Sequence, residues 1–194
     1  MTIPLRRVIR FTIGAGLVLA SWAEARAGRV PAYEESVFRA ANDASDRIRL
    51  PVRAVMQAGT FITVPIAATV AALAGRRRLA ANIAVGGTMA WFGAKLAKPY
   101  GGRGRPLGVL PDVTIRESIE GDLGWVSGHT AVATTLAFAA AEELPGAVRP
   151  GLAAIVATVG FGRMYVGAHL PHDLVGGAGL GMMISSVLPS ANGG

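Results

Sequence analysis

Three long stretches of this sequence contain no acidic or basic residue, and they constrain the fold more than any other feature. They cover residues 54–75, 123–141 and 174–194, if histidine is counted as neutral. A helix needs about 20 predominantly apolar residues to cross a bilayer. Charged residues make up only 16% of the chain, below the roughly 25% of an ordinary soluble domain. The sequence therefore predicts an all-α integral-membrane bundle rather than a soluble fold.

Apolar runs divide the chain into about six candidate transmembrane helices. The first run, Phe11–Ala23, is short, and two interpretations of it stay open. It is either an N-terminal membrane helix with Arg10 snorkelling to the interface, or a cleaved secretory signal that ends near Ala25-Arg26-Ala27. We favour the uncleaved helix. Five further runs follow, at about 54–75, 79–97, 128–142, 151–168 and 172–189.

Residues 31–50 mix apolar and charged side chains with the spacing of an amphipathic helix, which favours a position at the membrane interface. A polar connecting loop with one helical turn fits the same pattern. The sequence thus predicts three regions. Residues 1–27 form an N-terminal transmembrane helix or signal, 28–50 form an interfacial segment, and 51–190 form the main membrane domain.

Arginines indicate the orientation in the membrane. Arg76, Arg77 and Arg78 lie between two predicted spans and are the clearest cytoplasmic signal in the chain. With this triplet inside, the 98–127 and 163–173 connections lie outside, and both termini lie in the cytoplasm. We therefore expect a multi-pass protein of the plasma membrane.

Charge and composition exclude several other classes of protein. The net charge is +7, but the arginines neither follow one amphipathic helix nor alternate with aromatic residues, which argues against nucleic-acid binding. The chain has no cysteine, so disulfides, thiolate metal sites and cysteine nucleophiles are excluded. The oligomeric state and any protein partner are left open.

Residues suited to binding phosphate gather on the predicted outer face. They include Lys98, Arg105 and Arg163. The arginine fork matches the geometry of phosphate oxygens, and lysine adds a point charge. Ser127 precedes an apolar helical run, as an N-cap does, and Gly128 leaves backbone N–H groups open to an anion. These residues predict a site for phosphate or another tetrahedral oxyanion.

Two of the three histidines are suited to catalysis at such a site. His169 and Asp173 are four residues apart, on either side of a proline that can begin the last helix. The carboxylate can then accept a hydrogen bond from one ring nitrogen and leave the other nitrogen's lone pair aimed at phosphorus. His129 can donate a proton to the leaving oxygen. The nearby cations can offset charge on the transferred phosphoryl group.

Three motifs occur in order: Lys98-x6-Arg105-Pro106, Ser127-Gly128-His129 and Arg163-x5-His169-x3-Asp173. Together they resemble the type 2 phosphatidic acid phosphatase (PAP2) family, which shares its site with vanadium haloperoxidases; any one motif alone would be a weak signal. The resemblance implies a PAP2-like membrane phosphatase domain over residues 51–190, without a metal ion or other cofactor. It also implies a phosphohistidine on His169, orientation by Asp173 and general acid catalysis by His129. Phosphate binding would fall to Lys98, Arg105, Ser127, Gly128 and Arg163.

The sequence departs from the family pattern at two positions. Val126 stands where proline is usual, which loosens a turn slightly, and Gly162 stands where serine is usual, which can remove one hydroxyl contact to phosphate. Neither position carries the chemistry. Outside the motif residues, Arg103 is expected to be a solvated loop charge or a headgroup contact, and His172 to cap a helix or face water.

Acidic and aromatic residues around the motifs receive simple interpretations. The acidic cluster predicts a solvated loop that can also gate access; it consists of Glu117, Glu120 and Asp122. Three aromatic residues near span ends are expected to be interfacial anchors; they are Trp91, Tyr100 and Trp125.

Hydrolysis of a lipid phosphate is the function that this pattern favours. We expect a polyprenyl diphosphate or phosphosugar lipid as the substrate, with phosphatidate or phosphatidylglycerophosphate as the alternative. A vanadium-dependent haloperoxidase is a remote alternative, because those relatives are soluble and much longer. A non-enzymatic membrane protein with a relic site is disfavoured by the intact His129, His169 and Asp173.

Overall fold

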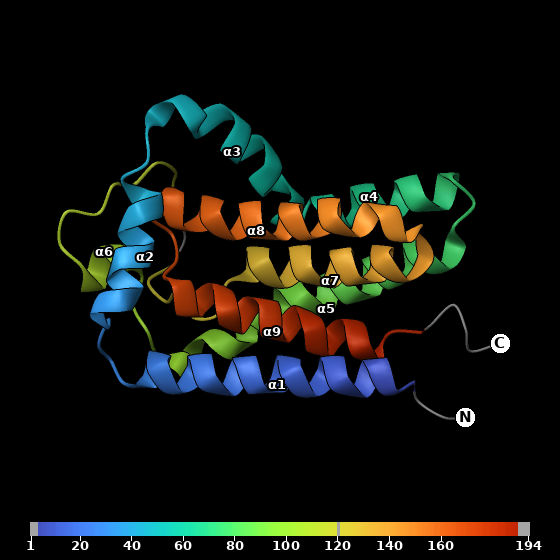
Figure 1. Cartoon of the computed structure of the whole chain (residues 1–194), viewed down its shortest axis with the longest axis horizontal. Coiled ribbons are helices and arrows are strands. Elements are labelled where there is room, and N and C mark those ends of the chain that lie inside the picture. Colours follow the sequence, from blue (N-terminus) through green and yellow to red (C-terminus); the bar gives the residue numbers. More distant parts are fainter. Residues whose placement is uncertain (1–3, 120, 190–194) are drawn as a thin grey trace.

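The computed structural model describes residues 4–119 and 121–189, which form an α-helical bundle without a β-strand (Figure 1). The predicted all-α fold class is therefore confirmed. Some residues with a predicted role lie outside the described ones: residues 1–3 of the N-terminal region, Glu120 of the acidic cluster, and position 190 at the end of the main domain.

Five long helices run along the long axis of the molecule (Figure 1). Helix α7 is central and packs against α5, α8 and α9, whereas α1 packs mainly on α9. The bounds agree closely with most of the predicted apolar runs: α1 Leu5–Arg26, α5 Arg77–Gly101, α7 Gly128–Glu143, α8 Arg149–Tyr165 and α9 Pro171–Val187.

Shorter elements cover one end and one side of this bundle. Helices α2 (Ala32–Asn42) and α6 (Pro106–Val109) lie at the left end in Figure 1, opposite the end where α1 begins and α9 finishes. A short 3-10 helix, Gly146–Val148, joins α7 to α8. The remaining elements lead from α2 to α5 and are η1 Asp46–Ile48, α3 Arg49–Met56, η2 Gln57–Gly59 and α4 Thr63–Leu73.

The prediction of one continuous span over 54–75 is wrong. The helical segments Asp46–Gly59 and Thr63–Leu73 meet at a bend of 72°. Pro65 lacks a backbone N–H and fits only the first turn of a helix, where α4 has it. The hydroxyls of Thr60 and Thr63 both donate to the carbonyl of Gln57, which gives the chain a local alternative to continuing the helix.

Helix α1 is longer than its apolar run and includes the basic residues before it. It is the one helix among the described residues that alone is long and apolar enough to cross a membrane, and the bent pair would be a second. The number of six spans stays a prediction. Arg10 does not snorkel: its side chain is 10% exposed and pairs with Glu142 of α7 at 2.7 Å.

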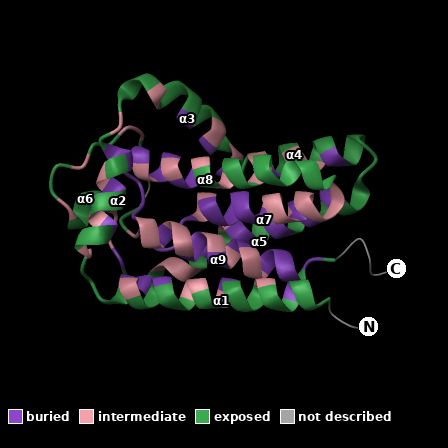
Figure 2. Ribbon diagram, in the orientation of Figure 1, coloured by how far each residue is buried: buried purple, intermediate pink, exposed green. Residues whose placement is uncertain are grey.

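Glycine allows α1 and α9 to approach each other closely. A Cβ atom on Gly14 would lie 2.7 Å from the Gly179 carbonyl oxygen, and one on Gly179 would lie 2.6 Å from that of Gly14. This close packing is the role expected of small residues in membrane helices. Exposed residues are plentiful along α1, α3 and α4, and the buried ones concentrate in the middle of the bundle (Figure 2).

Candidate active site

A cavity of about 410 Å³ brings together six of the eight residues predicted to form the site. Its wall is completed by α3, η2, α5 and the connection between α6 and α7, through residues such as Met56, Gln57, Trp91, Lys95 and Glu117. The six predicted residues that line it are Lys98, Arg105, Gly128, His129, Arg163 and His169. Ser127 and Asp173 are completely buried and do not line the cavity.

The N-terminus of α7 borders this cavity. Ser127 is its N-cap, as the sequence predicts, and its hydroxyl accepts hydrogen bonds from the backbone N–H and the hydroxyl of Thr130. The Ser127 backbone N–H donates to the carbonyl of Asp173 at 2.9 Å. Ser127 thus joins α7 to α9. The next two residues, Gly128 and His129, reach the cavity, with the His129 ring edge-on to Trp91 at a centroid distance of 5.7 Å.

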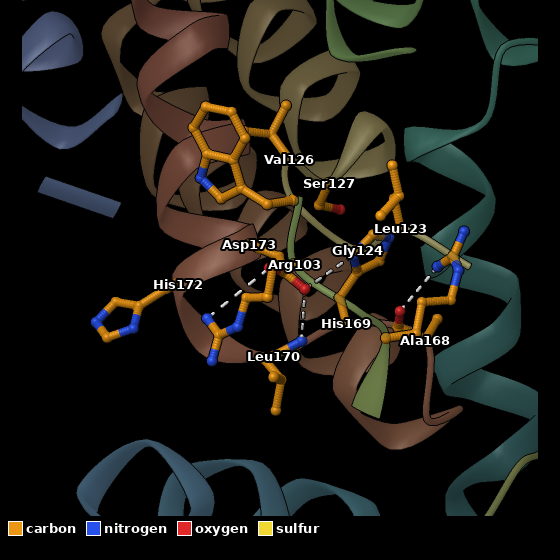
Figure 3. Close-up of polar contacts among 12 residues, drawn as sticks. Arg103, Leu123, Gly124, Val126, Ser127, Ala168, His169, Leu170, His172 and Asp173 are labelled. Carbon is orange, nitrogen blue, oxygen red and sulfur yellow. Dashed lines mark hydrogen bonds and ion pairs between the residues drawn. The ribbon is translucent and has the colours of Figure 1, made fainter. Parts of the chain in front are cut away.

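His169 lies in the loop between α8 and α9, and the first turn of α9 orients its ring. Its Nδ1 atom is 3.4 Å from Asp173 Oδ2, which also accepts a hydrogen bond from the backbone N–H of Leu170 at 2.9 Å (Figure 3). The carbonyl of Arg163 accepts from the backbone N–H groups of Ala168 and His169. The loop that carries His169 is therefore fixed at both ends.

Burial and the nearby cations keep His169 uncharged. Its side chain is 4% exposed, and burial, followed by the positive charges of Arg163, Lys98 and Arg105, lowers the pKa of His169 well below its usual range. A neutral imidazole with one nitrogen turned to a carboxylate has a free lone pair on the other. His169 thus has the protonation state that a nucleophile needs.

Lys98 and Arg105 also hold the surrounding loops. The Lys98 ammonium donates to the carbonyls of Leu123, Gly124 and Val126, at 2.9, 3.1 and 3.4 Å. Arg105 donates to the carbonyls of Gly121 and Ala168, at 2.6 and 2.9 Å. Both cations therefore fix backbone segments around the cavity that they line.

Arg163 pairs with an acidic side chain inside the cavity. Its Nη1 atom donates to Glu117 Oε1, and both residues line the cavity. Glu117 belongs to the acidic cluster for which the sequence predicts a solvated loop. Its side chain, however, is only 19% exposed. The Glu117 carboxylate thus accepts a hydrogen bond from the Arg163 guanidinium, which the motif assigns to phosphate binding.

The structure corrects two predictions made outside the motif residues. Arg103 is not a solvated charge: it is 4% exposed and forms a bidentate ion pair with Glu34 of α2. Trp125 is not an interfacial anchor, because it is 4% exposed and its indole N–H donates to Ser21 of α1 at 3.1 Å. The partners of both residues come from distant segments of the chain, so the local sequence does not indicate that these side chains are buried.

Sequence reasoning missed Glu34, which is completely buried. Its carboxylate accepts from the backbone N–H of His172 at 2.9 Å as well as from Arg103. His172 is half-buried and lies beside Tyr33, with ring centroids 5.8 Å apart. The only available signal was the Glu34-Glu35 pair at the start of an amphipathic segment, and it does not show which glutamate points inward.

Comparisons with known proteins agree with this fold and identify the family. The family model of the PAP2 superfamily matches residues 78–192, more than half of the chain. The chain belongs to the PAP2 superfamily, and it is a PAP2-type phosphatase. The resemblance inferred from the three motifs is thereby confirmed.

Two solved structures share the fold. LpxE from Aquifex aeolicus is 20% identical, with a TM-score of 0.72 over 80% of this chain and 93% of its own. A transmembrane PAP2-type phosphatidylglycerolphosphate phosphatase from Bacillus subtilis is 18% identical, with a TM-score of 0.69 over 90% of this chain and 93% of its own. None of the curated proteins matches this sequence.

Proposed function

We propose that this phosphatase hydrolyses a lipid phosphate at the extracytoplasmic face of the plasma membrane, through a phosphohistidine on His169. The favoured substrate is a polyprenyl diphosphate or phosphosugar lipid. The observation that carries the proposal is the shared cavity, which contains two histidines and three cations from five separate helices and loops. Such convergence supplies a nucleophile, a proton donor and donors for the phosphate oxygens.

The reaction would proceed in two displacements. His169 Nε2 attacks phosphorus and the bond from phosphorus to the leaving oxygen breaks, which is the bridging oxygen of a diphosphate or the ester oxygen of a lipid monophosphate. His129 gives a proton to that oxygen. A water molecule then attacks the phosphohistidine, gives a proton back to His129 and releases inorganic phosphate. Lys98, Arg105 and Arg163, together with the backbone at Gly128, would stabilise the charge on the phosphoryl oxygens.

The surroundings of the cavity support a lipid rather than a soluble ester. Phe61 lies between Trp91 and Phe92, with ring centroids 5.9 and 5.7 Å apart. Phe61 and Phe92 are exposed, and Trp91 lines the cavity. An apolar surface therefore leads from the outside of the bundle to His129, as the tail of a membrane lipid requires.

Lys95 supports a diphosphate substrate within the lipid class. It lines the cavity one turn before Lys98, with its ammonium 5.3 Å from the centre of the Trp91 ring. A second phosphate next to the scissile one would meet this ammonium, whereas phosphatidate has only one phosphate. The preference for a polyprenyl diphosphate rests on this position.

A phosphate-release assay on the purified protein in detergent tests the proposal. The panel compares polyprenyl diphosphate, phosphatidate and phosphatidylglycerophosphate, each with and without chelator. We expect release that is fastest with the diphosphate, insensitive to chelator and abolished in His169→Ala. Full activity in His169→Ala would contradict the mechanism, and faster release from phosphatidate would contradict the substrate.

A further inference from the structure

A buried ion pair lies directly behind the residues assigned to catalysis. The Arg103 guanidinium donates to both carboxylate oxygens of Glu34, with Nη1 2.9 Å from Oε1. The side chains are 3% and 0% exposed. Neither residue belongs to the three motifs. Glu34 comes from α2, and Arg103 comes from the connection after α5, so the pair fixes α2 against the loop that carries Arg105.

The second neighbour of Arg103 is Asp173. Arg103 Nη1 lies 4.0 Å from Asp173 Oδ1, a buried oxygen with no hydrogen-bond partner of its own. The other carboxylate oxygen faces His169 and Leu170. Figure 3 shows the Asp173 carboxylate between the Arg103 guanidinium and the His169 ring. The order of contacts is therefore Glu34, Arg103, Asp173, His169.

A buried carboxylate is costly to ionise unless a positive charge is near it. The groups that face Asp173 come from several elements: the cations Lys98 from α5 and Arg103 and Arg105 from the connection after α5, and the neutral His169 ring from the loop before α9. Lys98 and Arg105 also line the cavity and would be engaged by phosphate. Arg103 does not line the cavity, so its charge stays with Asp173 throughout the reaction.

We propose that Arg103, held in place by Glu34, is a positioning residue that keeps Asp173 ionised and oriented toward His169. The inference rests on the proposed role of His169. It assigns a catalytic purpose to α2, because Glu34 fixes the guanidinium from outside the motif-bearing helices. A fixed guanidinium also explains why one oxygen of a completely buried carboxylate is left without a hydrogen bond.

The test is the dependence of kcat on pH in four variants of the full chain. Arg103→Met removes the charge, Arg103→Lys keeps it without the bidentate geometry, and Glu34→Gln keeps the shape while removing the opposite charge. Glu142→Gln is the matched control, because Glu142 forms a buried ion pair with Arg7 at the opposite end of the bundle. Thermal unfolding in detergent and the KM for the lipid are measured for each variant.

The proposal predicts that loss of Arg103 and loss of the Glu34 charge both lower kcat but affect the acidic limb of the pH profile differently. In Arg103→Met, kcat falls about 100-fold because His169 is misoriented, while KM stays within a few-fold because the phosphate ligands are untouched. The acidic limb of its profile moves up by about one pH unit, since Asp173 takes a proton more readily without the guanidinium. In Arg103→Lys the limb returns toward its wild-type position. In Glu34→Gln kcat falls, but the limb stays in place or moves down.

A structural clamp alone would behave differently. In that case the Arg103 and Glu34 variants would lose thermal stability, as Glu142→Gln is expected to do on breaking its own ion pair. Every pH profile would stay unchanged. That result would overturn the inference. If Arg103→Met does not fold, the same result in Arg103→Lys or Glu34→Gln decides. Wild-type protein that releases phosphate through His169 would still support the proposed function. Full activity in His169→Ala would remove both.

Discussion

The Glu117 carboxylate accepts a hydrogen bond from the Arg163 guanidinium inside the cavity where a substrate phosphate is expected to bind. The two groups cannot both satisfy the same donors, so Glu117 must leave Arg163 before phosphate can replace it. We predict that Glu117→Gln lowers the inhibition constant of inorganic phosphate about 3- to 10-fold, as expected for loss of a competing, partly buried ion pair. Product-inhibition kinetics measure this constant.

Asp112→Asn is the matched control for that experiment. Asp112 lies on the same connection between α6 and α7, is exposed, and does not line the cavity. Its variant should bind phosphate as the wild type does. If Glu117→Gln bound phosphate more weakly, Glu117 would be part of the phosphate site rather than a competitor for Arg163.

Lys98 should matter for stability as well as activity, because its ammonium donates to three backbone carbonyls. Lys98→Met leaves those carbonyls without a charged donor, and we expect it to lower the free energy of unfolding by about 2 kcal/mol in addition to abolishing activity. Lys95→Met is the control, since Lys95 is exposed and its ammonium lies over the Trp91 ring. Equal thermal stability of the two variants would show that the three carbonyls do not depend on Lys98.

Several of the structural expectations could be made from sequence because they depend on local pattern. The three motifs identify the family, and the apolar runs give the bounds of α5, α7, α8 and α9 to within about four residues, whereas α1 begins well before its run. Ser127 caps α7 and Pro171 begins α9, as their residue types predict. These features follow from interactions between residues close together in the chain.

The missed features depend on contacts between distant segments. Glu34 and Arg103 are 69 residues apart in sequence, and each alone resembles an ordinary surface charge. The pairing of Arg163 with Glu117 likewise depends on where a loop without regular structure crosses the cavity. Helix periodicity contains no information about such long-range pairs, so only the folded chain reveals them.

Helix α1 should be an integral part of the bundle rather than a removable signal, and its glycines test this. Gly14→Ala would place a methyl group 2.7 Å from the Gly179 carbonyl oxygen, and we expect overpacking to lower the free energy of unfolding by about 1–3 kcal/mol. Gly16 is the control, because a Cβ atom there meets nothing within 4 Å. Gly16→Ala should be neutral or slightly stabilising. A purified protein that lacked residues 1–27 and kept full activity would contradict the prediction.

His169 should make the folded protein less stable in acid. The pKa of His169 is lowered in the folded state by burial and by the charges of Arg163, Lys98 and Arg105, whereas in the unfolded chain it is near 6.5. Below about pH 6.5 the unfolded state therefore binds a proton that the folded state does not, so stability is complete above this pH and declines as the pH falls.

Between pH 7.5 and 5 this difference amounts to at most about 2 kcal/mol. Thermal unfolding of wild type and His169→Gln across that range isolates the contribution, because all other titrating groups are common to both. We expect the wild type to lose more stability in acid than the variant, so that the gap between the two curves changes with pH. Parallel curves would mean that His169 takes up a proton in the folded state as readily as in the unfolded chain. Burial and the nearby cations would then not be the reason that the His169 ring is neutral.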